Sequence, residues 1–153
     1  MVTIISNSPE ESFQLGLTWA KEMQPGWIVG LTGDLGVGKT QLVKGLAVGW
    51  QIQGRVASPT FNLMHEHATA SQPLIHMDLY RLESPDAIWD AGLAEYLQSP
   101  SSGWVIVEWI DRWTQISLKD RTEVPDVHQP FRWIQIEGDL EQERTIVYED
   151  FRD

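Results

Sequence analysis

The sequence contains no cysteine, and this absence excludes disulfides, thiolate metal sites and thiol nucleophiles. It also lacks any run of about 18 apolar residues, the length that a membrane-spanning helix needs. The N-terminal stretch "MVTIISNSPEES" has neither the basic region nor the apolar core of a signal peptide. We therefore expect a cytoplasmic protein with no membrane partner.

Basic residues are scarce, since 11 Lys and Arg stand against 22 Asp and Glu and the net charge is −11. Proteins bind a nucleic-acid backbone through clustered Lys and Arg side chains, so this composition disfavours direct binding. We expect any role with nucleic acid to be indirect. The length of 153 residues and the apolar content of 42% predict one domain covering residues 1–153.

Helix and strand patterns alternate over the first two thirds of the chain, which is typical of a partly parallel sheet with helices packed on it. In the first helix, Ser8 is the expected N-cap, Pro9 the first helical residue and Glu11 the partner in a capping box. Helices are predicted for "SPEESFQLGLTWAKEM" (8–23), "KTQLVKGLAVGW" (39–50) and "SPDAIWDAGLAEYL" (84–97), and strands for "WIVGL" (27–31), "FNLMHEH" (61–67), "LIHMD" (74–78) and "WVIVE" (104–108).

The last third of the chain has a different pattern. "FRWIQIEGD" and "RTIVYE" alternate apolar and polar residues on either side of a Gly-Asp turn, which predicts an antiparallel hairpin with one solvated face. Residues 114–130 show little periodicity and are expected to form a loop. The predicted fold class is α/β, with a mixed, largely parallel sheet flanked by helices and followed by this hairpin.

The stretch "GDLGVGKT" (33–40) matches the pattern G-x4-G-K-[ST] and lies between a predicted strand and a predicted helix. In this pattern, glycines let backbone N–H groups point at phosphate oxygens, and the helix N-terminus adds positive potential. Lys39 would neutralise the β and γ phosphates, and the Thr40 hydroxyl would bind Mg²⁺. We predict a phosphate-binding loop within a P-loop nucleotide hydrolase-like fold.

Two carboxylates end predicted strands, because Asp78 closes "LIHMD" and Glu108 closes "WVIVE". The carboxyl ends of parallel strands line the crevice where ligands bind. Either carboxylate could hold Mg²⁺, and either could act as a base in hydrolysis. The alternative is that each one only marks the return of the chain to solvent.

Thr60 is a third candidate, because it lies in "ASPTFNL" just before a predicted strand. Pro59 restricts Ser58 to extended conformations. A threonine here could reach a γ phosphate or its Mg²⁺, as switch residues do in nucleotide-driven ATPases and GTPases. A plain Ser-Pro turn explains the same residues, and these physical arguments alone favour the turn.

The stretches "LTGDLGVGKT", "SPTFNL", "HMDLYRL" and "VEW" follow one another in this order. This ordered set resembles the motifs of the TsaE family (formerly YjeE), small bacterial P-loop ATPases required for the threonylcarbamoyl modification of adenosine 37 in tRNAs. The resemblance runs from about Ser8 to Trp109 and implies MgATP binding, slow hydrolysis and association with the TsaB and TsaD subunits of the modification complex. One departure is Ile110, which stands where a proline commonly follows the Glu-Trp pair.

The resemblance also implies roles for particular residues. Thr40 and Glu108 would bind Mg²⁺, Thr60 would act as a switch-like threonine, and Asp78 would be an acid needed for hydrolysis. In this family the ATPase supports turnover of the complex while other subunits carry out the transfer to tRNA. The ATP phosphate loop would consist of Gly33, Asp34, Leu35, Gly36, Val37, Gly38, Lys39 and Thr40.

Other residues lie near these motifs in the sequence. By the same resemblance, Asn7 and Ser12 would border the nucleotide. Trp109 could contact a partner or the nucleotide, or could pack in the core. His76 is expected to point off the face that carries Asp78 and to be structural, and Arg81 could pair with a phosphate or with an acidic neighbour.

Two other classes of protein use the same loop. A small-molecule or nucleoside kinase would need an acceptor pocket and usually a lid with several basic residues, and this chain has no basic cluster after Glu83. A GTPase-type switch usually carries Asn-Lys-x-Asp, and neither Asn7 nor Asn62 precedes a lysine. The sequence therefore favours an ATPase, with the kinase as the alternative.

Overall fold

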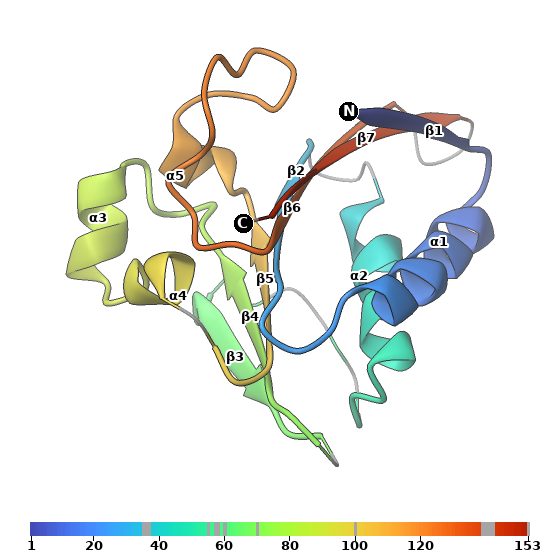
Figure 1. Cartoon of the computed structure of the whole chain (residues 1–153), viewed down its shortest axis with the longest axis horizontal. Helices are drawn as coiled ribbons and strands as arrows, with labels where there is room; N and C mark the ends of the chain where they lie inside the picture. The colour runs from blue at the N-terminus through green and yellow to red at the C-terminus, as the bar shows by residue number, and fades with distance from the viewer. Residues whose placement is uncertain are drawn as a thin grey trace.

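The computed structural model describes residues 1–34, 38–54, 56, 59, 61–69, 71–99, 101–138 and 143–152 (Figure 1). The elements are β1 (Val2–Ser6), α1 (Pro9–Glu22), β2 (Ile28–Thr32), α2 (Lys39–Gly49), β3 (Met64–His67), β4 (Leu74–Asp78), α3 (Pro85–Asp90), α4 (Glu95–Gln98), β5 (Trp104–Glu108), α5 (Asp111–Thr114), β6 (Phe131–Gly138) and β7 (Arg144–Phe151).

The strands form one seven-stranded sheet in the order β1-β7-β6-β2-β5-β4-β3. The central strands β6, β2, β5 and β4 are parallel. Antiparallel strands lie at both edges, where β7 and β1 follow β6 and where β3 follows β4. The sheet is therefore mixed around a parallel centre, as the alternation of helix and strand patterns predicts.

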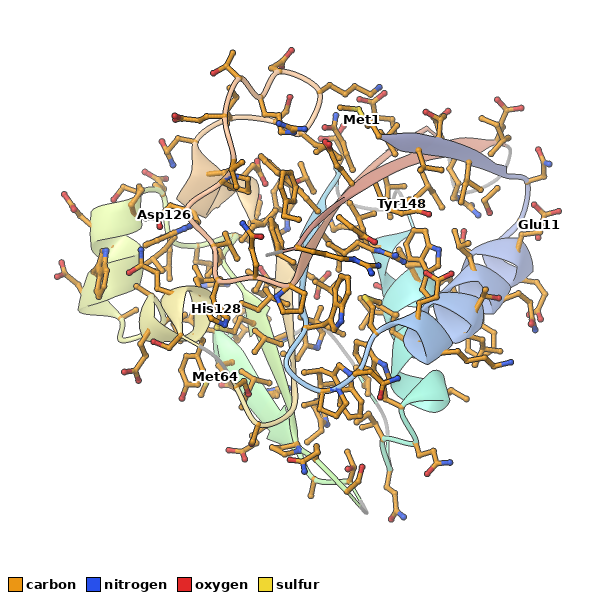
Figure 2. The ribbon with its side chains drawn as sticks, viewed as in Figure 1. Met1, Glu11, Met64, Asp126, His128 and Tyr148 are labelled. Atoms are coloured by element: carbon orange, nitrogen blue, oxygen red, sulfur yellow. The ribbon has the colours of Figure 1, made fainter. Side chains whose placement is uncertain are left out.

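Helices cover both faces of the sheet (Figure 1). Helices α1 and α2 lie on one face and enclose a core in which Trp50 stacks on Trp104 with the ring centroids 4.8 Å apart. On the same side, Tyr148 of β7, labelled in Figure 2, lies edge-on against Trp19 of α1. Helices α3, α4 and α5 lie on the other face. The central strands of the sheet are thus buried between two helical layers.

Helices α1 and α2 approach each other closely because glycines lie where they cross. A Cβ atom on Gly45 would come within 2.1 Å of the Phe13 carbonyl oxygen, and one on Gly16 within 2.4 Å of the Leu42 oxygen. Both contacts are with backbone atoms, which cannot move aside as a flexible side chain would. This packing holds the middle of α2 directly against α1.

The helix starts follow the predicted signals. Ser8 caps α1 by accepting a hydrogen bond from the backbone N–H of Glu11, and Ser84 caps α3 from the N–H of Ala87 in the same way. The Glu11 carboxylate accepts from the N–H of Asn7, one residue before the position that a capping box uses. Among the described residues, no helix has both the length and the apolar character needed to cross a bilayer.

Two predicted elements are shorter than expected. The single helix predicted over 84–97 is wrong, because Gly92 adopts a φ of 79° and ends α3. The Leu93 N–H then bonds to the Ile88 oxygen, which is the pattern of a glycine-terminated helix. The strand predicted over 61–67 begins only at Met64, because Leu63 has a φ of 65° and turns the chain.

The C-terminal hairpin is confirmed, but its predicted solvated face is wrong for β6. Six successive residues of β6, from Phe131 to Ile136, are buried. The strand pairs with β2 in parallel on one side and with β7 in antiparallel orientation on the other, so it lies inside the sheet. Its alternating polar residues are accommodated by specific partners, since the buried Arg132 forms a two-point ion pair with Asp150.

Candidate functional site

Three parallel strands end side by side at one edge of the sheet. Leu31 of β2 pairs with Glu108 of β5, which in turn pairs with Asp78 of β4. Glu108 and Asp78 are 4% and 3% exposed, so both carboxylates lie inside the protein. They do not mark the points at which the chain returns to solvent. The sheet therefore places two buried acids next to the segment that follows β2.

The predicted phosphate loop follows β2 directly. Gly33 and Asp34 continue from the strand, and Gly38 is the N-cap of α2 with a φ of 103°, a left-handed conformation that glycine adopts without strain. Gly38 has no side chain, so no side-chain hydrogen bond caps the N-terminus of α2. The loop positions Leu35, Gly36 and Val37 lie outside the described residues.

Lys39, the first residue of α2, is 7% exposed and turns back over the loop. Its ammonium group donates hydrogen bonds to the backbone oxygens of Gly33 and Asp34. Burial lowers the pKa of Lys39, although the nearby carboxylates Glu108, Asp78, Asp111 and Asp34 act to raise it. The site therefore combines one buried cation with a set of acids from three separate segments.

The two strand-end carboxylates are held in different ways. Asp78 Oδ1 accepts a hydrogen bond from the backbone N–H of Tyr80 at 2.9 Å. Glu108 Oε2 lies 2.7 Å from Nε2 of His76. The prediction that His76 points off the face of Asp78 is wrong, because residues two apart on a strand point to the same side. His76 is 1% exposed and belongs to the site.

Trp109 follows Glu108 in a left-handed conformation, with a φ of 61°. Its ring centroid lies 4.2 Å from Nζ of Lys39 and 5.0 Å from the ring centroid of Tyr80. The next residue, Ile110, donates its N–H to the Leu31 oxygen at 3.1 Å. A proline at that position could not donate this bond, so the departure from the family pattern adds one backbone hydrogen bond.

A buried arginine that the sequence reasoning missed lies beside the loop. Arg144 of β7 is fully buried, and a Cβ atom built on Gly38 would come within 3.2 Å of its Nε. Its Nη1 donates to the Ser12 hydroxyl, which also bonds to Ser6. Ser12 is thus a buried part of this network, whereas Asn7 is exposed. In the sequence, Arg144 carries no motif that would have revealed it.

The remaining predicted residues are less closely grouped. Thr60 lies outside the described residues, and Thr40 is exposed at the start of α2. Arg81 stacks on the ring of Phe61, 4.5 Å from its centroid. Within the described ranges, no three His, Asp or Glu side chains converge to hold a metal ion by themselves. Mg²⁺ is usually bound by one or two protein oxygens together with substrate phosphates, so Thr40 with Glu108 fits that kind of site.

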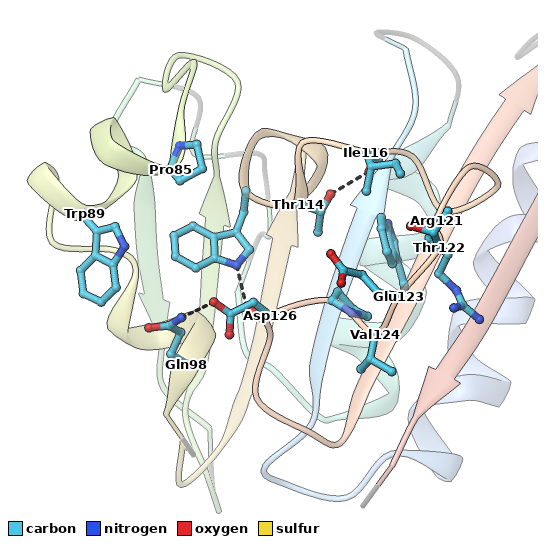
Figure 3. Close-up of a pocket in the computed structure, with 13 residues that line it drawn as sticks. Pro85, Trp89, Gln98, Thr114, Ile116, Arg121, Thr122, Glu123, Val124 and Asp126 are labelled. Atoms are coloured by element: carbon cyan, nitrogen blue, oxygen red, sulfur yellow. Dashed lines mark hydrogen bonds between the residues drawn. The ribbon is translucent and has the colours of Figure 1, made fainter.

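A cavity of about 570 Å³ lies on the face of the sheet that is away from α1 and α2 (Figure 3). Trp89 and Trp113, whose ring centroids lie 6.1 Å apart, line it, and Val124 contributes from the loop before β6. At its edge, Gln98 donates a hydrogen bond to Asp126. None of the predicted site residues lines this cavity, so it is separate from the phosphate loop.

Comparisons with known proteins agree with this architecture. Residues 6–146 match the family described as "Threonylcarbamoyl adenosine biosynthesis protein TsaE". Two proteins named tRNA threonylcarbamoyladenosine biosynthesis protein TsaE are similar to the chain. The one from Nostoc sp. is 38% identical over 73% of this chain and 70% of its own length. The one from Bacillus subtilis is 42% identical over 67% of this chain and 62% of its own length.

A solved structure is similar to the chain as a whole. The crystal structure of YdiB from the same Bacillus species superimposes with a TM-score of 0.68 at 30% identity, covering 96% of this chain and 83% of that one. This likeness confirms the predicted α/β P-loop fold.

Proposed function

The chain belongs to the TsaE family of threonylcarbamoyl adenosine biosynthesis proteins, and we propose from this premise that it is an accessory ATPase of tRNA modification. One observation carries the proposal. The buried Lys39 of the phosphate loop shares its surroundings with Glu108 and Asp78, two buried carboxylates at the ends of adjacent parallel strands. Phosphoryl transfer to water requires a cation beside the phosphate groups. It also requires acidic groups that hold a metal ion and orient the water molecule.

ATP would be held by the loop from Gly33 to Thr40. The left-handed Gly38 leaves no Cβ between the loop and Arg144, and the helix N-terminus that follows favours an anion. Lys39 would exchange its bonds to the loop carbonyls for bonds to the β and γ phosphates. Asn7 and Ser12 stay predicted as residues bordering the nucleotide.

Thr40 and Glu108 would hold Mg²⁺, which when bound neutralises charge on the phosphate oxygens. Asp78 would orient the attacking water or accept its proton, because its Oδ1 is anchored by the Tyr80 N–H while the carboxylate lies next to Glu108 in the sheet. Thr60 stays a predicted switch residue. The proposal thereby assigns the water to Asp78, a choice between Asp78 and Glu108 that the sequence left open.

The ATPase would serve the TsaB and TsaD subunits of the complex that makes N6-threonylcarbamoyladenosine at position 37 of tRNA. The net charge of −11 favours an indirect role with tRNA, and we propose a cytoplasmic location. ATP hydrolysis would then support turnover of the complex without chemistry on the tRNA itself.

The test is an ATPase assay with Mg²⁺, with and without TsaB and TsaD, on the wild-type protein and on Glu108→Ala. Losing a hydrogen-bond partner of a metal ligand typically costs about 10–100-fold, so losing the ligand itself should lower hydrolysis at least about tenfold. Nucleotide affinity should fall less. Glu66→Ala, which removes an exposed carboxylate of β3, is the matched control and should behave as wild type.

The proposal is wrong if the purified protein binds no ATP in a calorimetric titration with Mg²⁺ present. Phosphorylation of a small-molecule acceptor would instead point to the alternative, a P-loop kinase.

A further inference from the structure

His76 and Glu108 form a buried contact between neighbouring strands. They are 1% and 4% exposed, and 2.7 Å separates Nε2 of the imidazole from Oε2 of the carboxylate. His76 pairs with Ile106 in the sheet, so the Glu108 side chain leans back along β4 to reach it. An ionised carboxylate offers only acceptors, and the hydrogen of this bond therefore belongs to Nε2.

The other ring nitrogen of His76 supports the same assignment. Nδ1 is buried and has no hydrogen-bond partner among the described residues. A hydrogen on Nδ1 would be a buried donor without an acceptor. An Nδ1 without a hydrogen is an unpaired acceptor, which costs less free energy than an unpaired donor. The ring is therefore suited to one role, which is to donate from Nε2 to Glu108.

The described hydrogen bonding of the Glu108 carboxylate comes from this histidine. Within the described part of the chain, His76 is its only hydrogen-bond partner. Asp78, by contrast, accepts a hydrogen bond from the backbone N–H of Tyr80, whose presence does not depend on the Tyr80 side chain. A backbone group thus helps to hold Asp78, whereas the described contact of Glu108 is with a side chain.

We infer that His76 is a positioning residue for the nucleotide site, and that it orients Glu108 so that Oε1 stays available for Mg²⁺. This inference rests on the proposed function. Hydrogen bonds that orient metal ligands commonly contribute about 10–100-fold to metal affinity. His76 therefore sets how much Mg²⁺ the site needs, without touching the nucleotide.

Three variants test this role. His76→Leu removes the hydrogen-bond donor and fills its place in the core with an apolar side chain. His76→Gln replaces the imidazole donor by an amide N–H of similar reach. His67→Leu is the matched control, because His67 lies one strand further on the same face, opposite Leu74. Each protein is titrated with ATP by calorimetry at a series of Mg²⁺ concentrations and once with a chelator, and each is checked for folding by thermal melting.

The inference expects the Mg²⁺ concentration for half-maximal ATP binding to rise about tenfold in His76→Leu. His76→Gln should recover most of this loss, His67→Leu should match wild type, and ATP affinity with the chelator should not change. Nitrogen NMR of the ligand-free protein should show the hydrogen of His76 on Nε2.

The inference is overturned if His76→Leu melts earlier but needs the same Mg²⁺ concentration as wild type. It is also overturned if the Gln and Leu variants shift equally, or if the hydrogen lies on Nδ1. These results leave the proposed function intact when the wild-type protein binds MgATP. Failure of the wild-type protein to bind MgATP refutes the proposed function itself, and the inference with it.

Discussion

Replacing Lys39 by methionine should weaken ATP binding about 100-fold. Methionine keeps the unbranched stem of this buried residue, and it removes the charged group that lies 4.2 Å from the Trp109 ring centroid. The ammonium now bonds to the oxygens of Gly33 and Asp34, so it is already buried before any ligand arrives. Binding therefore exchanges one set of acceptors for another, with little further desolvation of the lysine.

The magnitude follows from the charges around Nζ. A hydrogen bond to a charged group contributes about 1.5–3 kcal/mol. The upper value applies here, because loss of the cation leaves the carboxylates that act on Lys39, Glu108 and Asp78 first among them, facing an anionic ligand. At about 1.4 kcal/mol for each factor of ten, about 3 kcal/mol corresponds to roughly 100-fold in Kd.

The assay is calorimetric titration of MgATP into the wild-type protein, Lys39→Met and Lys44→Met. Lys44 lies five residues further along α2 and lines a separate cavity with Phe13 and Ile52, so its variant removes the same charge from the same helix. Lys44→Met should bind within about twofold of wild type. If Lys39→Met is folded by thermal melting and also binds within twofold, Lys39 does not hold phosphate and the reasoning fails.

Two further predictions concern the scaffold that holds the site. Burial raises the pKa of Asp150, but its hydrogen bonds and charge contact with the 2% exposed Arg132 more than offset this and lower it. Because the pKa of Asp150 is lower in the folded than in the unfolded state, its ionised carboxylate stabilises the fold at pH values above the unfolded pKa. This stabilisation is lost as the pH falls through the folded pKa. Asp150→Ala should thus lower the free energy of unfolding, measured by urea titration, by about 3 kcal/mol at pH 7. The difference from wild type should be smaller in strong acid. An equal loss at both pH values would contradict this prediction. Gly45→Ala should destabilise the protein by about 1–3 kcal/mol, because its Cβ would meet the Phe13 oxygen at 2.1 Å, and an unchanged melting temperature would show that the helices separate freely.

Short-range signals explain the elements that could be predicted from the sequence. Ser8 caps α1 and "WVIVE" forms β5, because capping bonds and apolar runs involve residues close together in the chain. The break between α3 and α4 was missed for a related reason. Whether Gly92 interrupts a helix depends on how Leu93 and Ile88 pack in the core, and periodicity does not report this.

The burial of β6 could not be predicted from its own residues. "FRWIQIEG" alternates like a half-exposed strand, yet its place in the sheet is set by pairing with β2, which lies about a hundred residues earlier in the chain. The polar residue Arg132 is tolerated inside because Asp150 lies opposite it on β7. Only the folded sheet brings these partners together.

The phosphate loop could be predicted from the sequence, because its strand, glycine-rich turn and helix are consecutive and need no distant partner. The sequence also placed Asp78 and Glu108 at one sheet edge, since parallel strands carry their carboxyl ends to the same side. Which side-chain atoms contact one another depends on the folded chain. The bond from His76 to Glu108 and the packing of Arg144 against Gly38 depend on strand register and on side-chain rotamers, which are set by contacts between segments far apart in the chain.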